Sequence, residues 1–122
     1  MKTIAVDFDG VVHAYSKGWQ DGTIYDPPLP GALDALEALM ESYAVFIHTT
    51  RDAGTVAGWL SERGFDTLVD VEGPKHPKRE FWNDTGVLLV TDRKLPAVAY
   101  IDDRGIRFTD WKQALNDLAN VV

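Results

Sequence analysis

The fold is decided by the stretch Ile4-Ala5-Val6-Asp7-Phe8-Asp9-Gly10, close to the start of the chain. An apolar run that stops at two acids and a glycine predicts a short buried strand and the turn that ends it. Because side chains alternate along a strand, Asp7 and Asp9 can point to one side while Phe8 points into the core. Two carboxylates aimed together repel each other unless a cation or a shared proton lies between them. The stretch therefore predicts a chemical site that other parts of the chain must complete.

The length and composition of the chain limit what it can be. Its 122 residues are enough for one domain, residues 1–122, with one core. The formal net charge of −7 argues against a general nucleic-acid coat protein, which needs a basic surface. The absence of cysteine excludes disulfides and thiolate metal sites. No apolar run approaches the roughly 18–20 residues of a membrane span, and no signal peptide precedes Asp7, so we expect a cytoplasmic protein without membrane contact.

Strands and helices are expected to alternate along the rest of the chain. Helices are predicted over 31–42, over 53–63 and from Trp111 onward, and strands over 43–48, 65–71, 87–90, 97–101 and 106–108. The predicted strands are apolar throughout, without polar alternation, which indicates a parallel sheet covered on both faces. The fold class is therefore α/β with a mainly parallel central sheet. Trp59, Trp82 and Trp111 are expected in the core, and Phe81-Trp82 is expected to begin a short helix.

Polar side chains follow several of these strands at the point where each one ends. Asp7 and Asp9 follow the first strand, Thr49, Thr50 and Arg51 follow the second, and Asp102 and Asp103 follow a later one. Ligands of open parallel sheets bind at the carboxyl ends of the strands, so these groups are expected to meet in one crevice. Four carboxylates in one crevice need a cation, and oxygen ligands without Cys or clustered His favour Mg²⁺ over zinc.

The expected site has the parts that phosphate chemistry needs. With Mg²⁺ bound by Asp7, Asp9, Asp102 and Asp103, the carboxylate of Asp7 could attack phosphorus, as aspartate nucleophiles do elsewhere. Asp9 could protonate the leaving oxygen and later deprotonate the attacking water.

Further groups are candidates for contact with phosphate. Thr49 offers a hydroxyl and nearby backbone N–H groups at the start of a helix, and Lys94 is well placed to stabilise charge on phosphorus. Arg51 could bind phosphate or pair with a site carboxylate. Thr50 is a candidate for phosphate binding but also suits the helix cap.

Residues 11–30 form a Pro- and Gly-rich region with several aromatic side chains. Val11–Tyr15 could pair with Thr23–Tyr25 as a small hairpin. This region is either a surface loop whose aromatics cover the edge of the core or a flap over the site. In the second case His13 and Trp19 would face the substrate.

Several of these segments resemble motifs of the haloacid dehalogenase (HAD) superfamily. Asp7-Phe8-Asp9-Gly10-Val11-Val12 is similar to motif I, and Val45-Phe46-Ile47-His48-Thr49 is similar to motif II, an apolar strand ending in Thr or Ser. Lys94 followed by Tyr100-Ile101-Asp102-Asp103-Arg104 resembles motifs III and IV. The resemblance spans nearly the whole chain, and the motifs come in the right order.

The resemblance implies a Rossmann-like three-layer sandwich and a Mg²⁺-dependent hydrolase, a phosphatase that works through an aspartyl-phosphate. It makes Asp7 the nucleophile, and Asp9 the acid/base and a metal ligand through its backbone carbonyl. It implies that Thr49 binds phosphate and that Asp102 or Asp103 binds the metal. Lys94 is preferred as the lysine of motif III because Pro96 and the next strand lead straight into the acidic pair, and Lys75 is the alternative.

The family's cap domains have no counterpart here, because residues 11–30 have room for a short flap and residues 72–86 for a loop. An open site of this kind suits a phosphorylated small molecule or a nucleotide. A nucleic-acid end is disfavoured by the acidic charge, and a homo-oligomer could supply a lid. The alternative reading is a catalytically idle module on the same fold, with a phospholigand-binding or regulatory role.

Overall fold

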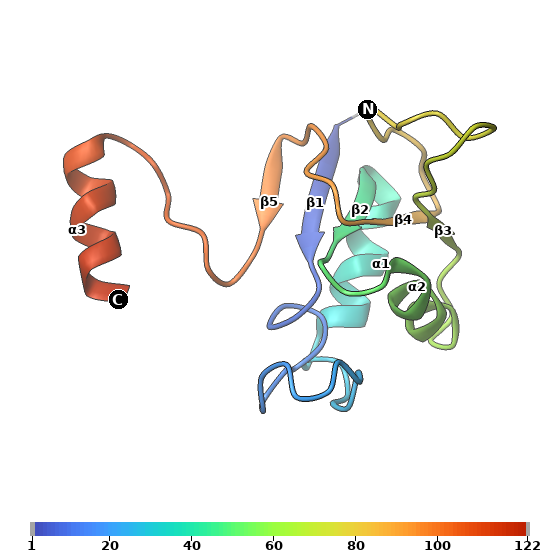
Figure 1. Ribbon diagram of the computed structural model, residues 1–122, viewed down its shortest axis with the longest axis horizontal. Helices are drawn as coiled ribbons and strands as arrows, with labels where there is room; N and C mark the ends of the chain where they lie inside the picture. Colours follow the sequence, from blue (N-terminus) through green and yellow to red (C-terminus); the bar gives the residue numbers. More distant parts are fainter. Residues whose placement is uncertain (1, 122) are drawn as a thin grey trace.

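Five strands form one parallel sheet in the computed structural model, which describes residues 2–121 (Figure 1). The strands are β1 (Thr3–Asp7), β2 (Ala44–His48), β3 (Thr67–Val69), β4 (Leu88–Thr91) and β5 (Ala99–Ile101). Their order across the sheet is β3-β4-β2-β1-β5, and every pairing is parallel. The prediction of an α/β fold with a parallel sheet is confirmed.

The register places the polar strand ends beside one another. Asp7 at the end of β1 is opposite His48 at the end of β2. On the other side of β1, Val6 is opposite Ile101, the last residue of β5. Residues that follow β1, β2 and β5 therefore start from three adjacent positions at the same edge of the sheet.

Two helices cover one face of the sheet. They are α1 (Ala32–Ser42) and α2 (Ala53–Ser61). Leu36 of α1 and Leu60 of α2 are buried in the same apolar cluster as Ile4 and Val6 of β1. Full burial of such a side chain contributes about 1.5–3 kcal/mol to folding. Phe8, just past the end of β1, is completely buried in this cluster, as predicted.

The opposite face is closed by non-helical segments. Phe46 and Leu89 of the sheet are buried there beneath Trp82 and Leu95, which belong to connections without helix or strand. A third helix, α3 (Trp111–Val121), stands apart from the sheet, as Figure 1 shows. Within residues 2–121 the helical layer thus lies on one face of the sheet, and loops form the second layer. No helix described in this part of the chain is long and apolar enough to cross a bilayer.

Several expected details of the fold are wrong. Residues 11–30 do not form a hairpin: single bridges join His13 to Asp9 and to Pro28 instead. Three prolines and several residues with positive φ prevent regular pairing there. Residues 106–108 form no strand and Phe81-Trp82 begin no helix.

The cap of α2 and the exposure of one tryptophan also differ from the expectation. Asp52, not Thr50, caps α2, with its carboxylate accepting the Thr55 N–H at 2.9 Å. An ionised carboxylate is a strong acceptor for the free N–H groups of a first helical turn. Trp59 and Trp82 are core residues as expected, but Trp111 is 71% exposed because α3 does not pack on the sheet.

Candidate functional site

A pocket of about 460 Å³ opens at the carboxyl ends of β1, β2 and β5. It is lined by Ala5, Asp7, Asp9, Tyr15, Trp19, His48, Thr49, Thr50, Tyr100, Ile101, Asp102, Asp103, Arg104 and Gly105. Three separate strand ends therefore contribute to one concave surface. Of the residues expected at a site, Asp7, Asp9, Thr49, Thr50, Asp102 and Asp103 all border this pocket.

Asp7 is the half-buried carboxylate at the base of the pocket. Its Oδ1 accepts the Phe8 N–H at 2.8 Å. Burial raises the pKa of Asp7 above its ordinary value, and the carboxylates of Asp103 and Asp102 raise it further. The Phe8 hydrogen bond and nearby His48 lower that pKa without cancelling the increase. Asp7 therefore lies in a field of like charge, which a bound cation would relieve.

Asp103 reaches across from the end of β5 to the turn that follows β1. Gly10 has φ +79°, and a Cβ atom at this position would overlap the carboxylate of Asp103. A glycine is therefore required both for its backbone conformation and for the close approach of Asp103. Asp102 turns back on its own loop instead, where its Oδ1 accepts the N–H groups of Arg104 at 3.1 Å and Gly105 at 2.5 Å.

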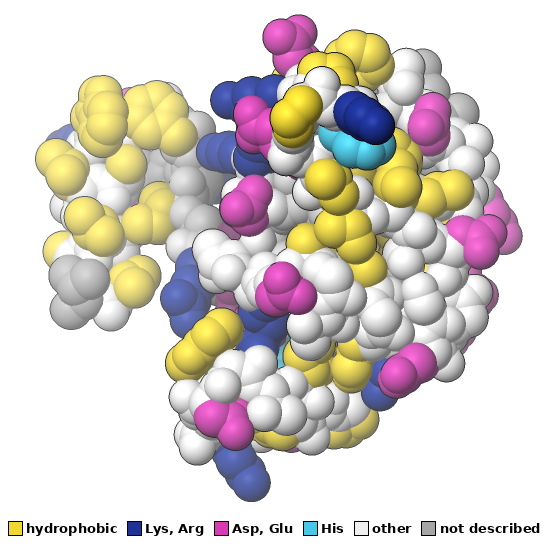
Figure 2. Space-filling view, turned by 45° about the vertical axis from the view of Figure 1, so that its right-hand side comes forward, with side chains coloured by type: hydrophobic (Ala, Val, Ile, Leu, Met, Phe, Trp, Pro, Cys, Tyr) yellow, Lys and Arg dark blue, Asp and Glu magenta, His cyan; other side chains and the backbone are white. Residues whose placement is uncertain are grey.

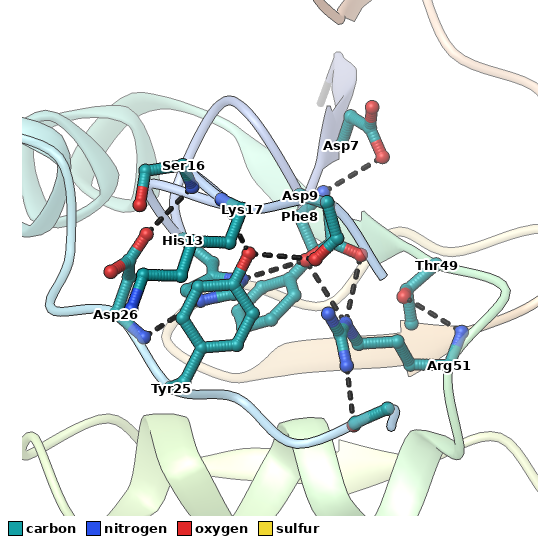
Figure 3. A network of polar contacts seen from close by, with 12 residues as sticks. Asp7, Phe8, Asp9, His13, Ser16, Lys17, Tyr25, Asp26, Thr49 and Arg51 are labelled. Atoms are coloured by element: carbon teal, nitrogen blue, oxygen red, sulfur yellow. Dashed lines mark hydrogen bonds and ion pairs between the residues drawn. The ribbon is translucent and has the colours of Figure 1, made fainter. Parts of the chain in front are cut away.

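Asp9 is held by two side chains (Figure 3). The Nε–H of Arg51 donates to both carboxylate oxygens of Asp9, at 2.8 and 3.0 Å. The Nδ1 of His13 lies 2.8 Å from Oδ1 of Asp9. On the other side of the ring, the Asp26 N–H donates to Nε2 of His13 at 3.1 Å. Because Nε2 accepts a hydrogen bond, the ring proton is on Nδ1, and the Nδ1–H group donates a hydrogen bond to Asp9.

Arg51 joins the loop of residues 11–30 to the site. Its side chain is nearly buried, and Nη1 donates to the Gly22 carbonyl at 2.5 Å. The guanidinium lies over the ring of Trp19, at 4.7 Å from the ring centroid, and 5.7 Å from that of Tyr15. Of the two roles open for Arg51, the structure shows the pairing with a site carboxylate. Arg51 thereby holds Asp9, the loop and two aromatic rings of the pocket wall in one arrangement.

Asp7 and Asp9 share the pocket, but their carboxylates face different partners. Figure 3 shows the Asp9 carboxylate between His13 and Arg51, whereas the Asp7 carboxylate is directed away from it. β1 ends at Asp7, so Asp9 lies in the turn after the strand, and its carboxylate is oriented by Arg51 and His13 rather than by strand alternation. In residues 2–121, no three acidic or histidine side chains are gathered closely enough to form a ready-made metal site.

Thr49 and Thr50 bring polar groups from the end of β2 to the pocket. Thr49 is buried, and its Oγ1 accepts the Arg51 N–H at 3.1 Å while its own N–H donates to the Thr91 carbonyl at 2.9 Å. The proton of the Thr49 hydroxyl can therefore be donated to a ligand in the pocket. Thr50 is exposed at the rim.

The two candidate lysines lie in different places. Lys94 is exposed beside the pocket wall, with Nζ 5.1 Å from the ring centroid of Tyr100, which itself lines the pocket. Lys75 lines a separate groove beyond β3, together with Lys78 and Arg79. Neither lysine borders the pocket itself, but Lys94 lies next to a residue that does.

His13 does not line the pocket. It is fully buried behind Asp9, between the rings of Phe8 and Tyr25, whose centroids lie 5.7 and 5.1 Å from its own. Its connection to the pocket is the hydrogen bond to Asp9. The backbone anchors of this arrangement, the Asp26 N–H and the Gly22 carbonyl, carry no signal in the sequence. Tyr100 could have been found, because it lies on the strand that leads into the acidic pair.

No family of known proteins, no curated protein and no solved structure matches this chain.

Proposed function

We propose that the protein is a Mg²⁺-dependent phosphomonoester hydrolase of the HAD type that works through an aspartyl-phosphate on Asp7. One observation carries the proposal. Asp7 and Asp103 come from the ends of two adjacent parallel strands and border one pocket, together with the hydroxyl of Thr49 from a third strand. A nucleophile, an acidic metal ligand and a phosphate-binding hydroxyl are what such a reaction requires.

The acidic residues of the pocket fit a magnesium ion. All of the donors are oxygens. The pKa of Asp7 is raised chiefly by burial and further by the charges of Asp103 and Asp102, and a divalent cation would offset those charges. Mg²⁺ needs one or two carboxylates, with waters and substrate oxygens as its other ligands. Asp7 and Asp103, with the Asp9 carbonyl and Asp102 as further donors, would hold it. When bound, the ion would neutralise charge between the carboxylate and the incoming phosphate.

The residues divide the reaction into two steps. In the first, an oxygen of Asp7 forms a bond to phosphorus as the ester P–O bond breaks, and the leaving oxygen takes a proton from Asp9. In the second, water attacks the phosphorus, its proton goes to Asp9, and the bond to Asp7 breaks. Thr49 would donate to a phosphate oxygen, and Lys94 would stabilise its negative charge. Arg51 and His13 are positioning residues, because they fix the orientation of Asp9.

A nucleotide is the favoured class of substrate. Trp19 is 51% exposed at the pocket wall and offers an aromatic surface on which a base can stack. A phosphorylated small molecule without a ring remains an alternative substrate, and a nucleic-acid end is disfavoured by the net charge of −7.

The direct test is release of phosphate from a panel of nucleotides and small phosphomonoesters, with and without Mg²⁺. Wild type should release phosphate only with Mg²⁺, and Asp7→Asn should be inactive. Asp34→Asn, which removes an exposed acid of α1, is the matched control and should keep full activity. Full activity of Asp7→Asn would refute the proposal.

A phospholigand-binding module without catalysis is the second candidate. The observation in its favour is that both Asp9 oxygens accept hydrogen bonds from the protein itself, which restricts proton exchange with a substrate. In that case Mg²⁺ and a nucleoside monophosphate would raise the Tm together, while no member of the panel was hydrolysed.

A further inference from the structure

The helix α3 exposes a complete apolar face. Trp111, Leu115, Leu118 and Val121 follow one another at helical spacing and are 71, 59, 45 and 74% exposed. No residue of α3 is buried, and the packed pairs of elements within residues 2–121 do not include it. Figure 2 shows hydrophobic side chains gathered over this helix, which stands apart from the remainder of the molecule.

A second apolar surface lies along β5, at the edge of the sheet. Val98, Tyr100 and Ile101 are 64, 38 and 42% exposed. β5 pairs with β1 on one side, and its other side is free of any strand in the described part of the chain. Exposed apolar edges of this kind are surfaces at which other chains dock.

The helix needs a surface on which to dock. A helix as short as α3 is marginal in water without tertiary contacts. Segment 102–110 leads α3 away from its own sheet (Figure 1). Along this segment, Phe108 is 57% exposed and packs edge-on against Trp111, with 5.2 Å between ring centroids, so it extends the apolar face of α3.

We propose that α3 of one chain docks on the β5 edge of a second copy of the same chain, and that the second copy does the same in return. Each copy carries both halves of the contact. Two copies related by a two-fold axis therefore cover all four apolar surfaces, and no such surface is left to bind a third copy.

The area and charge of the two surfaces agree with this arrangement. At roughly 150–250 Å² for a whole aromatic side chain and less for an aliphatic one, the exposed parts of these eight side chains come to on the order of 800 Å² per copy. A standard stable interface buries about 800 Å² on each partner. α3 contains one Lys and one Asp, so it adds no net charge to a contact between copies that each carry −7.

Docking of this kind would also affect the pocket. Tyr100 and Ile101 line both the pocket and the β5 edge. The helix of the second copy would therefore lie beside the rim of a pocket that has no cap domain. The docking itself does not rest on the proposed function, and it is tested without an activity assay.

Cross-linking between single-cysteine variants tests the contact, because the chain has no cysteine of its own. A tagged chain with Val98→Cys is mixed with an untagged chain with Leu118→Cys, and a short bis-maleimide is added. We expect a cross-linked heterodimer. Asn116→Cys, on the opposite face of α3, is the matched control and should give little of this product.

The solution mass supplies the second measurement. Wild type should sediment as a dimer, and Leu115→Asp/Leu118→Asp should sediment as a 13.6 kDa monomer. Because α3 buries nothing in its own chain, the circular dichroism and Tm of this variant should show a folded sheet domain. A monomeric wild type, a dimer that survives the double substitution, or cross-links formed only within one chain that carries both cysteines would each overturn the proposal.

Discussion

The Nε atom of Arg51 lies 2.8 Å from Oδ2 of Asp9, across a sequence separation of 42 residues. This contact ties the end of β2 to the turn after β1. The same guanidinium donates to the Gly22 carbonyl and lies over Trp19, so one side chain fixes both an acidic residue and a wall of the pocket. An arginine is suited to this position because its planar group donates in several directions at once.

Replacement of Arg51 by lysine should therefore reduce activity although the charge is kept. A lysine cannot donate to Asp9 and to Gly22 while stacking on Trp19. Displacement of a catalytic group by about 1 Å can cost roughly 100-fold in rate, and we expect a fall in kcat of that order for Arg51→Lys. Arg107→Lys, at an exposed position away from the pocket, is the control and should behave as wild type. Equal kcat values for the two variants would contradict a positioning role.

The lysine of the site can be identified by a matched pair of substitutions. Lys94 lies beside Tyr100 of the pocket wall, whereas Lys75 lines a different groove. Removal of a charge that stabilises a transition state costs about 10²–10³ in kcat, so Lys94→Ala should lose activity on this scale and Lys75→Ala should not. Steady-state kinetics at saturating Mg²⁺ would decide between them, and the reverse pattern would make Lys75 the functional residue.

The meeting of the strand ends could be predicted from the sequence, but the way Asp9 is held could not. Apolar runs ending in Asp7, Thr49 and Asp102 identify strands and the edge where ligands bind, because strand period and parallel topology follow from local pattern. The Asp9 contacts depend on the path of residues 11–30, with positive φ at Tyr15 and Gln20. No periodic pattern encodes such a path.

The position of α3 illustrates the same limit. The spacing of Trp111, Leu115 and Leu118 predicted a helix with one apolar face, and the helix is there. Spacing says that this face must be covered but not by which surface, since any apolar patch of suitable shape satisfies the hydrophobic effect. A helix expected to close the core of its own chain is therefore found outside that core.

Gly10→Ala should separate the cost of backbone strain from the loss of the Asp103 contact. Gly10 and Gly86 have φ values of +79° and +80°, but only at Gly10 would a Cβ atom meet Asp103, while no described atom lies within 4 Å of a Cβ at Gly86. A side chain at positive φ costs about 1–2 kcal/mol, which is the loss expected for Gly86→Ala. Gly10→Ala should lower the free energy of unfolding by more than Gly86→Ala, because its Cβ must also displace Asp103.

The same pair tests the acidic site. Gly10→Ala should abolish the rise in Tm that Mg²⁺ causes, because the displaced Asp103 no longer faces Asp7. Gly86→Ala should keep that rise. Thermal denaturation with and without Mg²⁺ measures both effects, and an unchanged response in Gly10→Ala would show that Asp103 does not hold the ion.

Asp7→Asn should stabilise the protein at neutral pH while it abolishes activity. The pKa of Asp7 is raised above its ordinary value of 3.8, chiefly by burial and further by Asp103. A carboxyl with a raised pKa favours the folded state when protonated, so its contribution is fully present below 3.8 and is lost as the pH rises through the raised value. At pH 7 the ionised Asp7 therefore opposes folding, and the neutral asparagine should raise the Tm by a few degrees in EDTA.

Near pH 3 the two proteins should have nearly the same Tm. Asp34→Asn, at an exposed position, should show no such pH-dependent difference. A lower Tm of Asp7→Asn at pH 7 would mean that the Phe8 hydrogen bond outweighs burial and the acidic pair.

Trp19→Ala should distinguish nucleotides from smaller phosphomonoesters. Trp19 is half-exposed on the pocket wall, and its ring is held in place by the guanidinium of Arg51. Stacking of a base on an aromatic side chain contributes about 1–3 kcal/mol, so loss of the ring should raise KM for a nucleoside monophosphate roughly tenfold. The KM for glycerol phosphate, which has no ring to stack, should stay the same, as should kcat for both. Trp19→Phe keeps an aromatic surface, so its KM for the nucleoside monophosphate should be close to that of wild type. An equal rise in KM for both substrates would instead assign Trp19 to the general shape of the pocket, since a base-specific contact affects only the substrate that carries a base.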